Sequence, residues 1–364
     1  MVMSYVLGDP QASFAAVMAL LARYDLLGAG GRLRSGVRLI SIGDHFDYDL
    51  RAPEVSGVEG LAVLRWLASH PPEQVSLLFG NHDAARVIEL AQVSDREFAE
   101  ARALALEIEQ TKHAEGRAAA KLRERDEFLP RFPLSTYGIV ARDYASFTEE
   151  QRALVVELLL AGRFHLALTG ALPDGREVLV THAGVTQREV ELLGVEPQPR
   201  PIAAALEDLF SAAIAARRDD WQRGAITPLS LEPVSQAGAP GEEAGGLLAH
   251  RPTNPNRMGA DLAWEFAPER PRRLDPRELP RGLTQVAGHT NHAMCLRELA
   301  AWATPAARAA PRAGIRTLRV EGDRITYDLG IQPPAADAAD LILIDGELRD
   351  PANRAELLEL RTES

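Results

Sequence analysis

The sequence has almost no cysteine, no long hydrophobic run and no excess of basic residues. Cys295 is the single cysteine among 364 residues, so it cannot form an internal disulfide, and we expect a buried thiol in a reducing compartment. No apolar stretch approaches the roughly 18 residues that a membrane span needs. The amino terminus also lacks the basic segment of a secretory signal. These absences predict a cytoplasmic protein with no membrane contact.

Basic residues are outnumbered by acidic ones. The chain has 40 Lys and Arg against 52 Asp and Glu, which gives a net charge of −12. Because no global positive field attracts polyanions, we expect no extended nucleic acid as a partner. A phosphate-bearing substrate would have to be held locally, by metal ions or by a few arginines.

Internal repeats with a period of roughly 20 to 50 residues are also absent, which excludes a solenoid or a propeller. Short β-type runs instead alternate with helical patterns, which predicts an α/β fold. The expected strands are Ser4–Leu7, Arg38–Ile42, Val75–Phe79, Phe164–Thr169, Glu177–Thr181, Gln285–Ala287, a hairpin of RTLRV and ITYDL, and LILID at 341–345. The expected helices are Ala12–Leu27, Val58–His70 and Glu150–Ala161.

The expected organisation is a single domain over residues 1–345. Residues 94–127 are rich in Ala, Glu and Arg without a strand signal, which predicts a helical insert. Residues 224–246 are rich in Gly, Pro and Ser, which predicts a long loop. Residues 346–364 are expected to form a C-terminal tail.

Polar side chains follow five of the apolar runs. In open α/β sheets the ligand crevice lies at the carboxyl ends of the strands, so these side chains are expected to converge. Carboxylates, carboxamides and imidazoles together form a site for divalent metals. The residues are Asp9 and Gln11, Asp44 and Asp47, Asn81 with His82 and Asp83, His182, and His289 with His292.

The donor set favours two ions. One carboxylate, Asp44, can bridge two divalent metals, and such a pair activates a water and clamps a phosphoryl group for in-line displacement. Asp9 and Gln11 would complete one side. The other side would consist of Asn81, His182 and His289.

The ordered motifs GDPQ, GDHFD, GNHD, THAG and AGHT resemble those of the calcineurin-like metallophosphoesterase superfamily. The closest branch in pattern is that of the bacterial Ser/Thr protein phosphatases and diadenosine tetraphosphatases, and the resemblance covers most of residues 4–330. It implies a four-layer α/β/β/α sandwich and the metal ligands named above. It also implies that His82 is the general acid for the leaving oxygen and that Asp47 orients its imidazole, which agrees with elementary acid-base chemistry.

Two departures from this pattern concern the metals. The first motif normally ends in histidine, whereas Gln11 stands there. A carboxamide oxygen is a weaker ligand, which favours Mn²⁺, with Fe²⁺ or Zn²⁺ as alternatives. His292 stands three residues after His289, where relatives often have a histidine two residues after. It is either a further ligand or an imidazole outside the coordination sphere.

A third departure concerns the substrate phosphate. The phosphatase branch has Arg-Gly after the second aspartate of GDHFD, but this chain has Tyr48 and Asp49. Substitutes for the missing guanidinium are Arg251, which lies in a segment similar to an arginine-bearing motif of relatives, and Arg86. His250 would contact the same phosphate or cap its loop.

The leading hypothesis is a metal-dependent phosphatase that hydrolyses a phosphomonoester or a nucleotide phosphoanhydride by metal-activated water. Its partner would be a phosphoprotein, a small phosphomonoester or a nucleotide. The alternative is a non-catalytic metal-binding regulatory or scaffold module, which Gln11 and the missing arginine favour. A general acid with an orienting carboxylate, His82 with Asp47, favours the enzyme.

Overall fold

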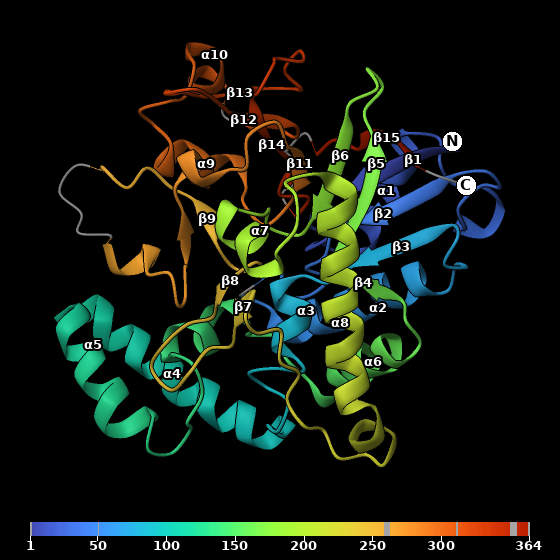
Figure 1. Cartoon of the computed structure of the whole chain (residues 1–364). Coiled ribbons are helices and arrows are strands. Elements are labelled where there is room, and N and C mark those ends of the chain that lie inside the picture. The colour runs from blue at the N-terminus through green and yellow to red at the C-terminus, as the bar shows by residue number, and fades with distance from the viewer. Residues whose placement is uncertain (1, 50, 258–262, 311, 350–354, 363–364) are drawn as a thin grey trace.

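A large mixed β-sheet with helices on both outer sides organises the chain (Figure 1). The computed structural model describes residues 2–49, 51–257, 263–310, 312–349 and 355–362. The strands of the sheet are β1 (Val2–Leu7), β2 (Arg38–Ser41), β3 (Val75–Leu78), β4 (Phe164–His165), β5 (Ala167–Ala171), β6 (Glu177–Thr181), β11 (Thr284–Ala287), β12 (Arg316–Glu321), β13 (Arg324–Leu329), β14 (Ala339–Leu343) and β15 (Leu358–Thr362). Two short pairs, β7 (Ser235–Gln236) with β8 (Gly245–Gly246) and β9 (Arg251–Pro252) with β10 (Arg273–Leu274), lie outside it.

The helices fall mostly between the strands, as an α/β pattern requires. They are α1 (Phe14–Arg23), α2 (Pro53–Ala68), α3 (Asn81–Ala85), α4 (Asp95–Glu115), α5 (Arg117–Arg123), α6 (Glu149–Leu160), α7 (Gln187–Leu193), α8 (Pro199–Gln222), α9 (His292–Glu298) and α10 (Pro305–Ala309). Thr148 caps α6, with its hydroxyl accepting a hydrogen bond from the backbone N–H of Gln151. None of the helices in the described residues combines the length and apolarity needed to cross a membrane.

The strand order is β13-β12-β14-β11-β6-β5-β15-β1-β2-β3-β4. It contains two parallel blocks, β1 to β4 and the set β6, β11 and β14, joined through antiparallel β5 and β15. Within each block the carboxyl ends of the strands meet at one edge. The two blocks therefore present two sets of strand ends.

Buried side chains alternate between the two faces of the sheet. Leu7 packs in the cluster formed with α1, α2, α6 and α8, and Leu341 packs in the cluster that includes residues of α9 and α10. Their neighbours Val6 and Ile342 share a third cluster that contains no helical residue. Helices thus cover the outer faces while the inner faces pack on strands, which confirms the predicted α/β/β/α sandwich.

The two blocks of strands meet at their carboxyl ends. The backbone N–H of His289, which follows β11, donates to both carboxylate oxygens of Asp9, which follows β1, at 3.0 and 2.9 Å. These strands are not neighbours in the sheet. The contact shows that the sheet folds so that both sets of strand ends reach a common place.

The region predicted as a helical insert contains α4, α5 and a π-helical turn over Glu124–Phe128. Figure 1 shows α4 and α5 standing to one side of the sheet. They form their own apolar cluster, which includes Phe98, Ile108 and Phe128. The predicted long loop over 224–246 carries β7 and β8 and buries Leu231 and Val234.

Two segments differ from the sequence-based prediction. Part of the expected tail, Leu358–Thr362, forms β15 inside the sheet between β5 and β1, because Leu358 and Leu360 are apolar on one face and buried there. The second segment is 199–222, for which the sequence-based prediction contains no helix; there α8 buries Ile202, Leu206 and Phe210 against the sheet. The single-domain division over residues 1–345 stays a prediction.

Replacing Leu360 by Ala tests whether β15 belongs to the core. Leu360 is fully buried, so Leu360→Ala is expected to lower the free energy of unfolding by about 2–5 kcal/mol. Glu359→Ala, which removes an exposed side chain from the same strand, is the matched control and is expected to have little effect. Urea denaturation of both variants measures this, and equal stabilities would contradict the placement of β15.

Candidate functional site

The polar residues that follow the strands gather where the two blocks meet. Asp9 follows β1, Asp44 follows β2 and Asn81 follows β3, all in the first parallel block. His182 follows β6 and His289 follows β11, in the second. All five side chains are brought toward one place because the blocks fold together there.

The loops after β2 and β3 touch so closely that one position must be glycine. A Cβ added at Gly80 would lie 2.3 Å from both the backbone N and the Oδ1 of Asp44. No side chain fits at that distance. Asp83, fully buried, joins the same loops by accepting hydrogen bonds from the backbone N–H groups of Gly80 and Asp44, both at 3.0 Å.

Three residues of this region hold the left-handed backbone conformation that favours glycine. Their φ values are 57° at Asp44, 67° at Asp47 and 59° at His289. Each such residue costs of order 1–3 kcal/mol, and such residues concentrate at functional sites. The hydrogen bond from Asp44 N to Asp83 is one of the contacts that hold this conformation.

Asp44, His182 and His289 form a group of buried side chains that can hold a metal ion. One ligand atom from each lies within 4.8 Å of the others. The Nε2 atom of His182 is the centre of the group, at 3.1 Å from Asn81 Oδ1, 3.2 Å from His289 Nδ1 and 3.4 Å from Asp44 Oδ2. These are four electron-rich atoms aimed at one another.

Hydrogen bonds on the far side of each ring determine which imidazole nitrogens are protonated. His182 Nδ1 donates to the carbonyl of Ile42 at 2.9 Å, and His289 Nε2 donates to the carbonyl of Ala249 at 3.1 Å. In the neutral rings the lone pairs of His182 Nε2 and His289 Nδ1 therefore face each other. Such bonds to backbone carbonyls orient metal-ligating histidines, so the residues present fit a metal ion.

The charges in this group reflect its burial. Burial opposes ionisation, but the charge of Asp44 and its hydrogen bond raise the pKa of His182 to about 9. Burial and the nearby Arg251 hold the pKa of His289 well below its ordinary value. For Asp44, the effect of burial is outweighed by His182 and His82, which lower its pKa. The buried Asp44 carboxylate therefore stabilises positive charge on its neighbours.

Asp9 lies beside this group, and Gln11 contacts the loop that follows β2. Asp9 is buried, and burial, together with the charge of Asp345, raises its pKa well above the ordinary value. A buried carboxylate beside other carboxylates is stabilised by a cation. The Gln11 Nε2 atom donates to the carbonyl of Phe46 at 2.9 Å, so the amide is held by its nitrogen end.

His82 and Asp47 form a hydrogen-bonded pair next to Asp44. The Nδ1 of His82 donates to Asp47 Oδ2 at 2.9 Å, while its backbone N–H donates to Asp44 Oδ1 at 2.9 Å. Burial opposes the charged imidazole, but Asp44 and Asp47 outweigh it and raise the pKa of His82. The second ring nitrogen, Nε2, remains directed toward Asp44 at 3.9 Å. This arrangement can deliver a proton.

Arg86 does not lie where the sequence analysis expects a phosphate ligand. Its side chain is fully buried and contacts Asp47 at 2.7 Å, Gln151 Oε1 at 3.1 Å and the carbonyl of His82 at 3.0 Å. The guanidinium is therefore committed to the protein interior. Together with Ser146, whose N–H and hydroxyl donate to Asp47 Oδ1, it fixes the carboxylate that holds His82.

Arg251 does line the pocket beside the group. This pocket of about 90 Å³ also contains Asn81, His82 and His289 in its wall. Among the described residues, the Nε of Arg251 is buried and has no hydrogen-bond partner, and the same holds for the Nη1 of Arg273, which lines the same pocket. Two unpaired N–H donors of this kind are costly unless an anion binds there.

Two predicted histidines are occupied elsewhere. The Nδ1 of His292 is bonded to the Tyr327 hydroxyl at 2.6 Å and its Nε2 donates to the carbonyl of Ala310 at 3.1 Å, so neither nitrogen is free for a metal. His250 is buried and donates from Nε2 to the carbonyl of Gly184 at 3.0 Å, so it does not reach a phosphate. Both residues support the backbone.

Arg273 and His45 have no role in the sequence-based prediction, and Asp83 appears there only among the polar residues that follow the strands. His45 is buried, with Nδ1 at 3.0 Å from the carboxylate of Asp83. The position of Asp83 inside the GNHD motif was a usable signal for a supporting role. Arg273 had none, because its approach depends on the pairing of β9 with β10, which are two residues long.

No protein-family model and no curated protein matches the chain. Among solved structures, it is similar to the cold-active protein-tyrosine phosphatase of a psychrophilic Shewanella species, with 12% identity, a TM-score of 0.40 and coverage of 99% of this chain and 76% of that one. It is also similar to a protein serine/threonine phosphatase from Saccharomyces cerevisiae that has similarity to human phosphatase PP5, with 12% identity, a TM-score of 0.32 and coverage of 93% and 83%. At these identities and TM-scores, neither likeness carries an argument about function.

Measuring the metal content of histidine variants tests whether His182 and His289 bind metal and His292 does not. His182→Ala and His289→Ala each remove a lone pair from the converging set, so Mn²⁺ binding is expected to weaken or disappear. His292→Gln, which changes a histidine with both nitrogens occupied, is expected to retain wild-type metal content. Metal analysis of dialysed protein, with circular dichroism as a check on folding, measures this. Metal loss in His292→Gln alone would overturn the assignment.

Proposed function

We propose that this chain is a phosphoesterase with a binuclear metal centre. The observation that carries the proposal is the convergence of Asn81 Oδ1, His182 Nε2, His289 Nδ1 and Asp44 Oδ2, with the protons of both rings engaged on the far side. Four acceptor atoms facing one another in a buried site call for a cation. The motif order that resembles the metallophosphoesterase superfamily supports the same conclusion.

The second ion of the proposed pair would be held by Asp9 and Gln11, with Asp44 shared between the two. Divalent ions held here would activate water and neutralise charge on a phosphoryl group. Among them we favour Mn²⁺, because one side of the centre offers the carboxylate of Asp9 and the carboxamide of Gln11 rather than a histidine.

The surrounding residues fit a phosphate ester as the substrate. Arg251 and Arg273 would contact the phosphate oxygens, since each lines the pocket and has a buried N–H without a partner among the described residues. His82 would donate a proton to the leaving oxygen. Asp47, held by Arg86 and Ser146, would keep the ring of His82 in the tautomer and orientation that this step needs.

This arrangement favours an enzyme over a regulatory module. A site that only binds metal has no need of the pair formed by His82 and Asp47, nor of the buried Arg86 behind it. Breaking a buried pair such as Arg86 with Asp47 costs about 3–5 kcal/mol, so its partners are strongly coupled. We propose a phosphomonoester or a phosphoanhydride as the bond that is cleaved.

Hydrolysis of p-nitrophenyl phosphate by metal-stripped protein tests the proposal. Turnover is expected to return with Mn²⁺, and with Fe²⁺ or Zn²⁺ if the centre accepts them. The acceptor atoms of the site carry no positive charge of their own, and divalent ions would supply it. Asp44→Asn is expected to abolish turnover, since this carboxylate would hold both ions. Turnover that needs no metal, or full activity in Asp44→Asn, would contradict the proposal.

The role of His82 is tested by the dependence of turnover on the leaving group. An alkoxide needs a proton in order to leave, whereas p-nitrophenolate does not. His82→Gln is therefore expected to lower kcat on glycerol phosphate by about 10²–10⁴-fold and to affect p-nitrophenyl phosphate much less. His113→Gln, at an exposed position in α4, is the control and should match wild type. An equal loss on both substrates would exclude general acid catalysis by His82.

A further inference from the structure

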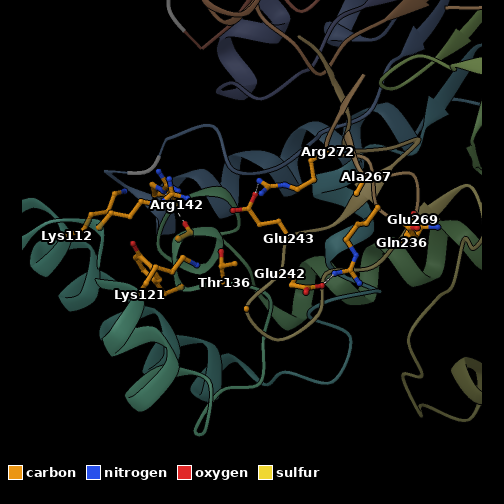
Figure 2. Close-up of a pocket in the computed structure, with 15 residues that line it drawn as sticks. Lys112, Lys121, Thr136, Arg142, Gln236, Glu242, Glu243, Ala267, Glu269 and Arg272 are labelled. Atoms are coloured by element: carbon orange, nitrogen blue, oxygen red, sulfur yellow. Dashed lines mark hydrogen bonds and ion pairs between the residues drawn. The ribbon is translucent and has the colours of Figure 1, made fainter. Parts of the chain in front are cut away.

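A large cleft lies next to the candidate site, between the helical insert and the segments around β7, β8 and β10. Its volume is about 830 Å³, within the range of roughly 300–1,000 Å³ that is usual for small-molecule sites. Figure 2 shows Lys112, Lys121 and Arg142 on one side of it and Glu242, Glu243 and Arg272 on the other.

Positive charge is concentrated in this cleft. Both lysines of the chain, Lys112 and Lys121, line it. Six lining residues are cationic, against the three acidic residues Glu242, Glu243 and Glu269, although the whole chain has a net charge of −12. The six are Lys112, Arg117, Lys121, Arg142, Arg270 and Arg272. A basic cleft on an acidic protein indicates an anionic ligand.

The surplus of positive charge lies on the side of the insert. On the wall that faces the insert, Arg270 pairs with Glu242 and Arg272 pairs with Glu243, so these charges are balanced. On the insert side, Arg117 is exposed and has no hydrogen bond or ion pair to any described residue. Its guanidinium is therefore available to a ligand.

Both lysines pair with a glutamate of the insert and remain partly exposed. Lys112 pairs with Glu109 and Lys121 with Glu124, each three residues away on the helix. Glu124 is buried, but the side chains of Lys112 and Lys121 are 30% and 47% exposed, so each ammonium group is accessible to a multiply charged anion in the cleft. Gly116, with φ of 96°, ends α4 and lets α5 begin at once, which brings both lysines to one wall.

The cleft adjoins the candidate site. Glu243 and Arg272 line both the cleft and the smaller pocket that contains Asn81, His82 and His289. A substrate whose scissile phosphate lies in the smaller pocket would therefore extend its leaving group into the cleft. The cations of the insert would then face that leaving group.

We propose that the cleft binds a second phosphoryl group carried by the leaving group of a small-molecule substrate. This inference rests on the proposed phosphoesterase function. Water adds its oxygen to the scissile phosphorus, the bond to the leaving oxygen breaks, and that oxygen takes a proton while the second phosphate stays in the cleft. Arg117, Lys112 and Lys121 are positioning residues for that phosphate, and the cleft volume of about 830 Å³ favours a small polyanion.

Two probes supply the second phosphate in different ways. Inorganic tripolyphosphate carries it in a phosphoanhydride chain, and fructose 1,6-bisphosphate carries it as a separate ester. Each is compared with p-nitrophenyl phosphate, which has a single phosphate. The readout is the ratio of kcat/KM for the probe to kcat/KM for the aryl phosphate.

The double variant Arg117→Ala/Lys121→Ala is expected to lower this ratio by about 10- to 100-fold, because two charge-assisted contacts are lost. If the ratio falls for one probe only, the cleft binds the second phosphate in the form that this probe carries. If it falls for both probes, the cleft binds a phosphoanhydride and a separate ester alike. Arg125→Ala is the matched control, because it removes an exposed cation from the same insert outside the cleft. An unchanged ratio, or an equal fall in Arg125→Ala, would overturn the proposal.

Calorimetric binding of tripolyphosphate to the same full-length proteins separates this inference from the proposed function. Binding that weakens about tenfold or more in the double variant alone supports the cleft even if no probe is hydrolysed. If no probe is hydrolysed but tripolyphosphate binding weakens in the double variant, the phosphoesterase proposal fails and the proposed anion site in the cleft stands. If the protein hydrolyses the probes but the kcat/KM ratio and the tripolyphosphate affinity are the same in all variants, the phosphoesterase proposal stands and the proposed phosphate site in the cleft fails.

Discussion

The carboxylate of Asp44 is the point on which the candidate site depends. Its backbone N–H is bonded to the buried Asp83, its Oδ1 accepts from the N–H of His82, and its Oδ2 lies 3.4 Å from His182 Nε2. It therefore joins the first parallel block of strands to the second. These contacts stabilise Asp44 in its left-handed backbone conformation and offset the strain of that conformation.

Behind this carboxylate the support is layered. His82 is held by Asp47, Asp47 by Arg86 and Ser146, and Arg86 by Gln151 from α6. Each step is buried, so a change at any step is transmitted to the imidazole that we propose as the general acid. Such preorganisation is what a catalytic proton donor requires, and a site that only stores a metal does not need it.

Much of the candidate site was predictable because the ends of buried strands can be recognised in the sequence. Short apolar runs followed by Asp44, Asn81, His182 and His289 identify parallel strands whose carboxyl ends meet, and the structure brings these residues together. What the sequence could not show is which neighbours compete for a side chain. His292 is engaged by Tyr327 and Ala310, and Arg86 is buried by Asp47 and Gln151, through contacts that only the tertiary fold creates. β15 was missed because strand pairing with β1 spans almost the whole chain, whereas the regular apolar spacing of α8 was a signal that could have been used.

The central claim, a pair of divalent ions that share Asp44, is tested most directly by anomalous X-ray diffraction from crystals grown with Mn²⁺. The account predicts two manganese peaks, both within coordination distance of the Asp44 carboxylate, one with His182 and His289 and the other with Asp9. No peak among these residues, or manganese bound only elsewhere on the surface, would contradict it.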